Sequence, residues 1–201
     1  MAIKAVIFDM VSVLLVPIKG TYETLLAERL GIDEKITSDI VNDPEHRKWD
    51  LDEIGDDEYY THLLNELNLP LEMKGILERF EIEDFYIDQV LLEFIQNLHK
   101  DYKTALLTNF PAHLHTHMKT KWNTGGAFDH IIASCDVKLL KPDPRMYKLA
   151  LSALDCNPDE AIFVDDRRVN TKAAEALGIR CVLYQDRDQG IKEIKQKLGI
   201  L

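Results

Sequence analysis

The stretch AVIFDMVSVLL, Ala5 to Leu15, decides the fold of this chain. It opens with a continuous apolar run without alternation, which is typical of a strand buried on both faces of a parallel sheet. The run ends on a single carboxylate, Asp9, and the sequence then turns apolar again through Val11. Open parallel sheets bind their ligands at the carboxyl ends of their strands. The stretch therefore predicts both a central strand and a site.

Four further short apolar runs, rich in Val, Ile and Leu, indicate four more buried strands: residues 104–108, 130–134, 161–165 and 181–184. The stretches between them are long enough for helices. Helical spacing is present in residues 88–100, 141–154, 168–177 and 189–201, and Gly178 is a predicted C-cap. This alternation predicts an α/β fold: a doubly wound, Rossmann-like core with a five-stranded parallel sheet.

The segment between the first two predicted strands is too long for a simple connection, which takes only a few residues in α/β units. It is helical in spacing and poor in strand signals, with breaks near Gly31, Pro44, Gly55 and Pro70. We therefore expect a helical module at residues 19–85, inserted after the first strand. Residues 1–18 and 86–201 form the predicted α/β core.

The composition is that of an ordinary globular protein, with 46% hydrophobic and 29% charged residues in 201. The formal net charge of −11 argues against nucleic acid and anionic membranes as partners, because both need a basic face, and favours a divalent cation. Cys135, Cys156 and Cys181 lack the spacing of a zinc motif, so we expect reduced, packed thiols. Without a secretory signal or a membrane-spanning run, a cytoplasmic protein is expected.

Polar side chains stand at the ends of the predicted strands or just before the next helix. They are Asp9, Thr108, Asn109, Lys141, Asp165 and Asp166. Three carboxylates that repel one another need a cation, and hard oxygen ligands suit Mg²⁺. A lysine and a hydroxyl directed at the same point suit a phosphoryl group. Each residue alone has a simpler explanation, as a helix cap, a turn former or a solvated loop residue, but their joint occurrence favours a site.

Four segments, VIFDM, LLTN, KPDPRMY and FVDDRRVNTKAAEALGI, resemble in order and spacing the four motifs of the haloacid dehalogenase superfamily. The resemblance covers essentially the entire chain and points to the sugar-phosphate phosphatase-like hydrolases with a helical cap after strand one (subfamily I). It implies a hydrolase core, with residues 19–85 as the cap. It also implies a Mg²⁺-dependent phosphatase acting on a small phosphorylated metabolite such as a sugar phosphate.

By this resemblance Asp9 is the nucleophile that forms an aspartyl-phosphate intermediate, and Lys141 pairs with the nucleophile and the transferred group. Thr108 and Asn109 hold the phosphoryl oxygens. Asn170 matches a position that helps to order the metal loop. The implied Mg²⁺ ligands are Asp9, the backbone carbonyl of Val11, Asp165 and Asp166.

The sequence departs from the family pattern at Val11. Phosphatases of the family usually carry Asp-x-Asp, whose second Asp is general acid to the leaving group and then base to water. Here Val11 is followed by Ser12, where Gly is common. A valine transfers no proton, and general acid–base catalysis is worth roughly 10² to 10⁴ in rate. A phosphatase hypothesis therefore predicts a preference for good leaving groups, or a replacement such as water, Ser12 or a cap residue.

Three alternatives remain open. A binding or regulatory protein would hold a phosphorylated metabolite or a protein partner without turnover. Dehalogenase chemistry also dispenses with the second Asp, although that branch normally lacks an acidic pair such as Asp165-Asp166. Phosphonatase chemistry needs a lysine from the cap, and none of the lysines there stands in a recognisable catalytic context: Lys19, Lys35, Lys48 and Lys74.

Substrate choice is expected to lie with the cap, which closes over the site. The stretch HRKWDLDEIG puts cations beside an aromatic ring, so Arg47, Lys48 and Trp49 are candidates for contact with the leaving group, against a simpler expectation of a solvated Arg-Lys pair and a packed Trp. In HLHTH, helical spacing brings His113 and His117 together as a pair able to bind a soft metal, but a solvated helix face is the simpler expectation. No feature predicts an oligomeric state.

Overall fold

The computed structural model describes residues 2–40 and 43–200. Five parallel strands form the central sheet, in the spatial order β5-β4-β1-β6-β7. They are β1 (Ala5–Phe8), β4 (Lys103–Thr108), β5 (His130–Ala133), β6 (Ala161–Asp165) and β7 (Arg180–Leu183). All five predicted strands are present, with ends within one residue of the prediction. The predicted doubly wound, five-stranded parallel sheet is confirmed.

The strand order determines where a ligand can bind. The chain moves from β1 outward through β4 and β5 and then crosses to β6 and β7 on the other side, so the order reverses at β1. Phe8, the last residue of β1, is level with Leu106 of β4 and Val164 of β6. The carboxyl ends of three adjacent strands therefore meet at the switch point, where open α/β sheets bind ligands.

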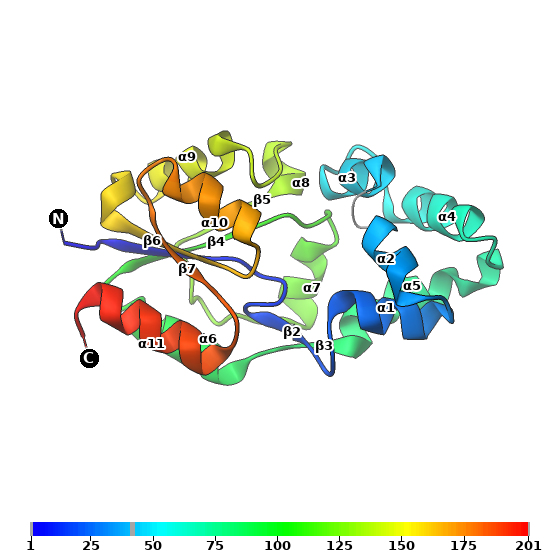
Figure 1. Cartoon of the computed structure of the whole chain (residues 1–201), viewed down its shortest axis with the longest axis horizontal. Helices are drawn as coiled ribbons and strands as arrows, with labels where there is room; N and C mark the ends of the chain where they lie inside the picture. Colours follow the sequence, from blue (N-terminus) through cyan, green and yellow to red (C-terminus); the bar gives the residue numbers. More distant parts are fainter. Residues whose placement is uncertain (1, 41–42, 201) are drawn as a thin grey trace.

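Helices cover both faces of the sheet (Figure 1). α6 (Gln89–Leu98) and α11 (Arg187–Leu198) lie on one face, and α9 (Pro144–Ala153) and α10 (Arg168–Glu175) lie on the other. Successive residues of β1 alternate between two hydrophobic cores, with Phe8 in one and Ile7 in the other. A strand covered on both sides needs apolar residues at every position, which explains the unbroken run at its start.

The helices of the core differ from the predictions only at their ends. The helix expected from residue 141 begins at Pro144, because Asp143 caps it by accepting a hydrogen bond from the Arg145 backbone N–H. The helix expected to end against Gly178 has its C-cap at Ala176 instead. Three short elements complete the core: α7 (Leu114–Thr120), α8 (Ser134–Val137) and η2 (Pro158–Glu160).

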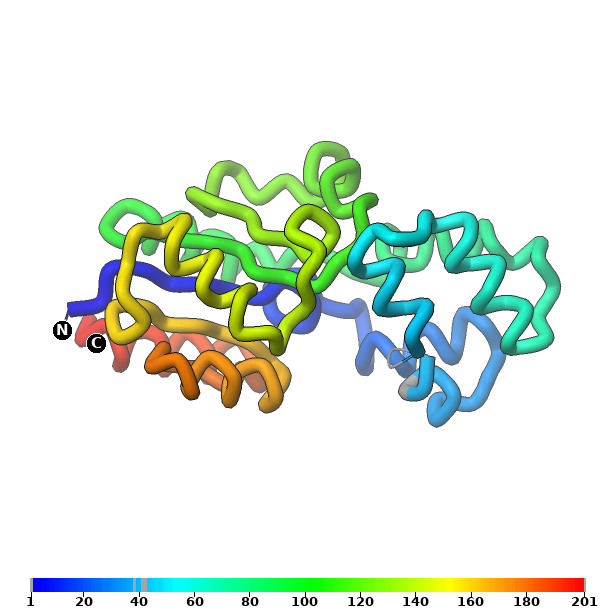
Figure 2. Tube along the Cα trace, turned by 90° about the horizontal axis from the view of Figure 1, so that it is seen from above, coloured from blue at the N-terminus to red at the C-terminus, as the bar shows by residue number. Residues whose placement is uncertain are grey.

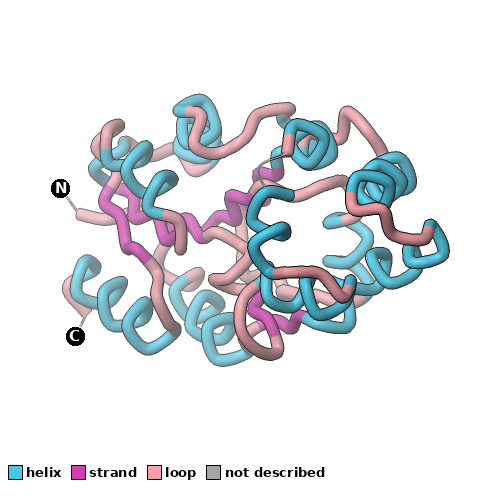
Figure 3. Tube along the Cα trace, turned by 45° about the vertical axis from the view of Figure 1, so that its right-hand side comes forward, coloured by secondary structure: helices cyan, strands magenta, loops and turns pink. Residues whose placement is uncertain are grey.

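A small antiparallel ribbon, β2 (Leu15–Pro17) paired with β3 (Phe85–Ile87), lies between the core and the helices inserted after β1 (Figure 3). The sequence analysis did not predict it. Three residues are too few for a hydrophobic period to distinguish a strand from a loop. Because β2 and β3 pair, the chain leaves the core and re-enters it at the same place.

The helices between β2 and β3 form a group beside the carboxyl edge of the sheet (Figures 1 and 2). They are α1 (Tyr22–Leu30), α2 (Glu34–Ile40), α3 (Pro44–Asp50), α4 (Asp56–Glu66), η1 (Leu71–Met73) and α5 (Lys74–Asp84). We propose that this group is the cap, with the boundaries at residues 19 and 85 still a prediction. Within the described ranges, no helix is long and apolar enough to cross a membrane.

Candidate active site

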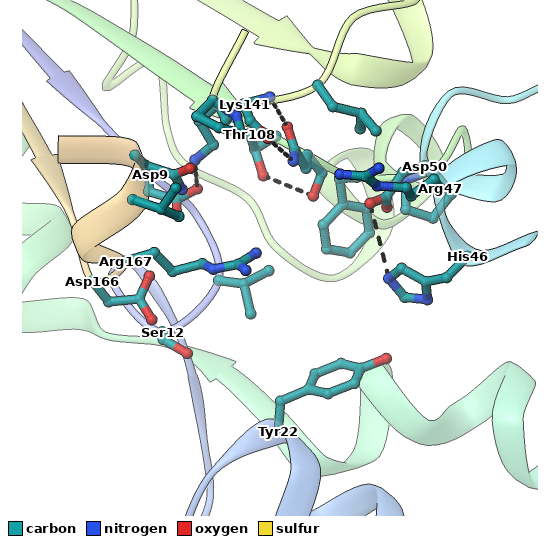
Figure 4. Close-up of a pocket in the computed structure, with 18 of the residues that line it drawn as sticks. Asp9, Ser12, Tyr22, His46, Arg47, Asp50, Thr108, Lys141, Asp166 and Arg167 are labelled. Atoms are coloured by element: carbon teal, nitrogen blue, oxygen red, sulfur yellow. Dashed lines mark hydrogen bonds and ion pairs between the residues drawn. The ribbon is translucent and has the colours of Figure 1, made fainter. Parts of the chain in front are cut away.

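A pocket of about 600 Å³ lies at the carboxyl edge of the sheet, between the strand ends and the helices α1, α3 and α5 (Figure 4). Its lining combines core and inserted residues that are far apart in the sequence. From the core come Asp9, Val11, Ser12, Thr108, Asn109, Phe110, Pro111, Leu140, Lys141, Pro142, Asp166, Arg167, Val169 and Asn170, and from the inserted helices come Thr21, Tyr22, Glu23, His46, Arg47, Trp49, Asp50 and Glu81. The structure thus brings most of the predicted site residues to one cavity.

Lys141 is the buried cation at the centre of this pocket. Its ammonium lies 2.6 Å from a carboxylate oxygen of Asp9 and 2.8 Å from one of Asp165. Burial lowers the pKa of Lys141, but the charges of Asp9 and Asp165 outweigh this effect and hold the pKa above its ordinary value. The lysine therefore remains charged and joins the ends of β1 and β6.

Asp9 follows β1, and its backbone N–H donates to the Val164 carbonyl of β6 at 2.9 Å. Burial raises the pKa of Asp9 well above its ordinary value. Lys141 opposes this shift, whereas Asp165 and Asp166 add to it. The excess negative charge of this carboxylate group is only partly balanced by the lysine.

Asp165 and Asp166 differ in their surroundings. Asp165 is fully buried and accepts four hydrogen bonds, from the Arg167 backbone N–H, from Lys141 and, at both oxygens, from the Asn170 amide. Asp166 lines the pocket, and burial followed by the charge of Asp165 raises its pKa to about 6. The carboxylate of Asp165 is already satisfied by the protein, whereas that of Asp166 faces the cavity (Figure 4).

The donor set fits a hard divalent cation. Oxygen atoms of Asp9, Asp165 and Asp166 lie within 4.8 Å of one another, and Lys141 alone does not neutralise three carboxylates. Carboxylate and carbonyl oxygens are the ligands that Mg²⁺ takes in proteins. Val11 lines the same pocket, so its backbone is available nearby whatever its side chain.

Thr108 ends β4, Asn109 follows it, and both line the pocket together with Lys141. The Asn109 side-chain amide donates to the Lys141 carbonyl at 3.1 Å, and its oxygen accepts from the Lys141 backbone N–H at 2.8 Å. This side chain therefore holds the backbone of Lys141, a task that the family resemblance did not imply. Thr108 is buried, with its hydroxyl at the cavity wall.

The three substrate-specificity candidates of α3 lie in different places. Arg47 lines the pocket. Trp49 also lines it, but it is buried, stacks on Tyr59 with ring centroids 4.3 Å apart and donates to Asp56 at 2.7 Å, in agreement with a packed residue. Lys48 is not among the lining residues, because it points to solvent and pairs with Glu45 at 2.6 Å.

Asp50, the last residue of α3, is a pocket residue that the sequence analysis missed. Burial and the charge of Glu81 raise its pKa to about 7, although Arg167, His113 and Lys141 oppose the shift. Nε2 of His46 lies 3.9 Å from a carboxylate oxygen of Asp50. The only signal in the sequence was its position beside Trp49, because a lone Asp at a helix end is usually an ordinary polar residue.

The expectation of a solvated histidine face is wrong for His113. This side chain is 12% exposed and lies between two carboxylates of the inserted helices, with Nε2 2.8 Å from Glu81 and Nδ1 3.1 Å from Asp56. His115, on the opposite side of α7, is 47% exposed. The sequence could not show that α4 and α5 pack against α7 at this point.

A family model for haloacid dehalogenase-like hydrolases matches residues 3–178 of the chain. The chain is 28% identical to the sesquiterpene phosphatase astK of Aspergillus oryzae over 200 residues. This alignment covers 98% of this chain and 97% of that protein. It is 38% identical over 73 residues to bifunctional epoxide hydrolase 2 of Sus scrofa, a match to 36% of this chain and 13% of that much longer relative.

Solved structures share the fold. A HAD-like family hydrolase from Porphyromonas gingivalis superposes with a TM-score of 0.76 at 20% identity, over 98% of both chains. A HAD family enzyme from Bacteroides thetaiotaomicron, in complex with magnesium and inorganic phosphate, superposes with a TM-score of 0.74 at 19% identity, over 92% of this chain and 95% of that one. At these identities the likeness is one of architecture.

Proposed function

The chain belongs to the haloacid dehalogenase-like hydrolases, and we propose that it is a Mg²⁺-dependent phosphatase of small phosphorylated metabolites, sugar phosphates included. Asp9 is the proposed nucleophile. The observation that carries this proposal is the position of Asp9 at the switch point of the sheet, 2.6 Å from the ammonium of Lys141 and within 4.8 Å of Asp165 and Asp166. This arrangement supports attack by a carboxylate on an anionic phosphate, because Lys141 offsets part of the negative charge and the carboxylates can hold a cation that offsets more of it.

Mg²⁺ would be held by Asp9, Asp166 and the Val11 carbonyl, and when bound it neutralises charge on the phosphoryl group. We assign Asp165 a positioning role, since its oxygens already accept hydrogen bonds from the protein. Lys141 offsets negative charge of Asp9 and Asp165. Thr108 and Asn109 line the pocket where the transferred phosphoryl group would bind.

The catalytic cycle needs a proton donor in place of the missing second Asp, and we propose Asp50 for this task. It lines the same pocket from the inserted side, across from Asp9 (Figure 4). In the first half-reaction, Asp9 forms a bond to phosphorus, the bond between phosphorus and the leaving oxygen breaks, and that oxygen takes the proton of Asp50. In the second half, the Asp50 carboxylate takes a proton from the water that attacks the aspartyl-phosphate, and inorganic phosphate and free Asp9 result. A pKa of about 7 suits both halves.

The other chemistries have less support. A phosphonatase needs a cap lysine in the pocket, but the only lysine among the described lining residues is Lys141 of the core. Lys19 and Lys74 pair with Glu28 and Asp57. A (S)-2-haloacid dehalogenase from a Pseudomonas strain is among the relatives, at 28% identity over 125 residues. The pair Asp165-Asp166 argues against that reaction here, because the dehalogenase branch normally lacks such an acidic pair.

A binding role without turnover is the second candidate, and Val11 is the observation that favours it. The substitution removes the usual proton donor but leaves the polar residues of the pocket in place. Catalysis and binding differ in a measurable way, because a binding protein releases no inorganic phosphate from a substrate that it holds.

Phosphate release from a panel of sugar phosphates, other metabolite phosphates and an aryl phosphate tests the proposal. We expect Mg²⁺-dependent release by the wild type and its loss in Asp9→Asn. Asp188→Asn is the matched control, because that carboxylate is 90% exposed and is not among the residues that line the pocket. Release that survives Asp9→Asn would exclude the nucleophile, and binding of a phosphorylated compound without release would favour the second candidate.

A further inference from the structure

A second cluster of metal-binding side chains lies apart from the carboxylate centre. It consists of Glu81 of α5, His117 of α7 and His113, the residue that caps the start of α7. We propose that these three residues, which we call the histidine cluster, form a Zn²⁺ site that links the inserted helices to the core. Its ligands differ from the proposed Mg²⁺ ligands, although Glu81 also lines the phosphatase pocket.

The geometry of the histidine cluster is that of a site with three protein ligands. One potential ligand atom from each of the three residues lies within 4.8 Å of the others. His113 and His117 are four residues apart, so they meet on one side of the helix, with ring centroids 4.8 Å apart. Glu81 reaches the two histidines from α5, and its carboxylate oxygen lies 2.8 Å from Nε2 of His113.

The second nitrogen of His113 is already oriented as metal ligands usually require. Its Nδ1 lies 3.1 Å from a carboxylate oxygen of Asp56, which also accepts a hydrogen bond from the Trp49 indole at 2.7 Å. Metal-bound histidines commonly donate their other N–H to a carboxylate, which fixes the tautomer and the ring orientation. Nε2 of His113 is therefore held toward Glu81 and His117.

His117 supplies an independent observation. Its Nδ1 is buried and has no hydrogen-bond partner, although the ring is packed between His113 and Trp122. A buried nitrogen without a partner destabilises the folded state, so such atoms call for an explanation. A metal bound through Nδ1 offers one, because coordination then uses the lone pair of this nitrogen.

The contact between His113 and Glu81 is already close to the spacing that a bound ion requires. Zn²⁺ binds nitrogen and oxygen ligands at about 2.0–2.1 Å, so two ligands at a tetrahedral angle are about 3.3 Å apart. The contact of 2.8 Å between His113 and Glu81 needs to open by about 0.5 Å, within the reach of small side-chain rotations. The three ligands leave a fourth position for water.

Donor chemistry separates this site from the carboxylate centre. Two imidazoles and one carboxylate suit Zn²⁺, whereas Asp9, Asp165 and Asp166 present oxygens alone and suit Mg²⁺. A third group of metal-binding side chains, His115, Cys135 and Asp136, lies on the other side of α7. His115 and Asp136 are about half exposed there, so this group lacks the enclosure of the histidine cluster.

Zn²⁺ titration of the full chain, with Mg²⁺ in large excess to occupy the carboxylate centre, tests the proposal. We expect one tight equivalent by calorimetry, a rise in melting temperature, and visible absorption bands of a tetrahedral site when Co²⁺ replaces Zn²⁺. His117→Gln and Glu81→Gln each remove one ligand, and we expect them to weaken binding by more than about 100-fold. Asp56→Asn, which loosens His113 only, should weaken it by about 10- to 100-fold.

His115→Gln is the matched control, because it changes the same helix and removes the competing group. We expect unchanged Zn²⁺ affinity in this variant. Loss of binding in His115→Gln, equal affinity in His117→Gln and Glu81→Gln, or no saturable Zn²⁺ binding by the wild type would each overturn the proposal. Far-ultraviolet circular dichroism without metal identifies a variant that fails to fold, and the other ligand variant then decides the result.

Discussion

The hydroxyl of Ser134 donates a hydrogen bond to the backbone carbonyl of Asp50, with an oxygen–oxygen distance of 2.6 Å. Ser134 begins α8 directly after β5, and Asp50 ends α3, so this bond ties the inserted helices to the core. The same hydroxyl oxygen accepts from the Phe110 backbone N–H at 2.9 Å. A single buried side chain therefore positions the proposed proton donor relative to the loop after β4.

Ser134→Ala should lower both stability and turnover. It leaves the Phe110 N–H without its partner, a loss of about 1–3 kcal/mol of unfolding free energy. It also frees the end of α3, so we expect a larger fall in kcat than in KM. Urea unfolding and steady-state kinetics measure the two effects. Ser134→Cys keeps a weak donor of similar size, so its stability and turnover should lie between those of the wild type and Ser134→Ala. Wild-type turnover in Ser134→Ala would show that this bond does not position Asp50.

Asp50→Asn tests the proposed proton transfer. We expect kcat for an alkyl phosphate, whose leaving group needs a proton, to fall by about 10² to 10⁴. An aryl phosphate with a good leaving group should be affected much less in the first half-reaction. In the wild type the alkyl phosphate rate should decline above about pH 7, where Asp50 loses its proton, and this limb should vanish in the variant. An equal loss for both substrates at every pH would contradict a role as general acid.

The same residue makes stability depend on pH. The pKa of Asp50 is about 7 in the folded protein and 3.8 for an ordinary Asp, so the folded state holds this proton more tightly. Its contribution is greatest below pH 3.8 and is lost as the pH rises through 7, with a limit on the order of 4 kcal/mol. Unfolding of wild type and Asp50→Asn should therefore diverge between pH 4 and pH 8, with the variant relatively more stable at the higher pH. If unfolding free energy changes with pH in the same way in both proteins, the group that titrates in this range is not Asp50.

Val11→Asp restores the missing carboxylate of the first motif. We expect faster hydrolysis of alkyl phosphates, and the clearest result should come in the Asp50→Asn background, where a second proton donor has the most to replace. Val11→Asn is the control, since it has the same shape without a transferable proton. Activity that stays the same or falls in Val11→Asp would count against an otherwise intact phosphatase site.

Ser12 explains why glycine is common at its position in the family pattern. Its φ is +62°, in the left-handed region, and its N–H donates to the Leu15 carbonyl at 2.8 Å in the turn before β2. This conformation costs a residue with a Cβ roughly 1–2 kcal/mol. Ser12→Gly should raise the unfolding free energy by up to about 1 kcal/mol, after the extra chain entropy of glycine is subtracted. Ser12→Val, which is branched at Cβ, should lower it. Chemical denaturation midpoints at constant m-value measure both.

Much of the core could be predicted because its signals are local. An apolar run at every position of Ala5–Phe8 indicates a strand covered on both faces, and the five strands followed from such runs. Asp9, Thr108 and Asp166 stand at or directly after strand ends, and Lys141 lies in the loop before α9, so their order in the sequence was sufficient to predict them at one edge of the sheet. The ribbon of β2 and β3 was not predicted, because strands of three residues are too short to show a hydrophobic periodicity.

The sequence by itself determined the five strands, the carboxylates at their ends and the absence of a second motif-one Asp, since each of these signals lies within a short segment. Only the tertiary structure decided which inserted side chains face that centre. Asp50 enters the pocket while Lys48 points to solvent, and His113 meets Glu81, 32 residues earlier in the chain. These contacts depend on how α3 and α5 pack across the core. The physical reason is that burial and charge pairing between distant elements depend on all the packed surfaces together, whereas strand and helix patterns are properties of short segments.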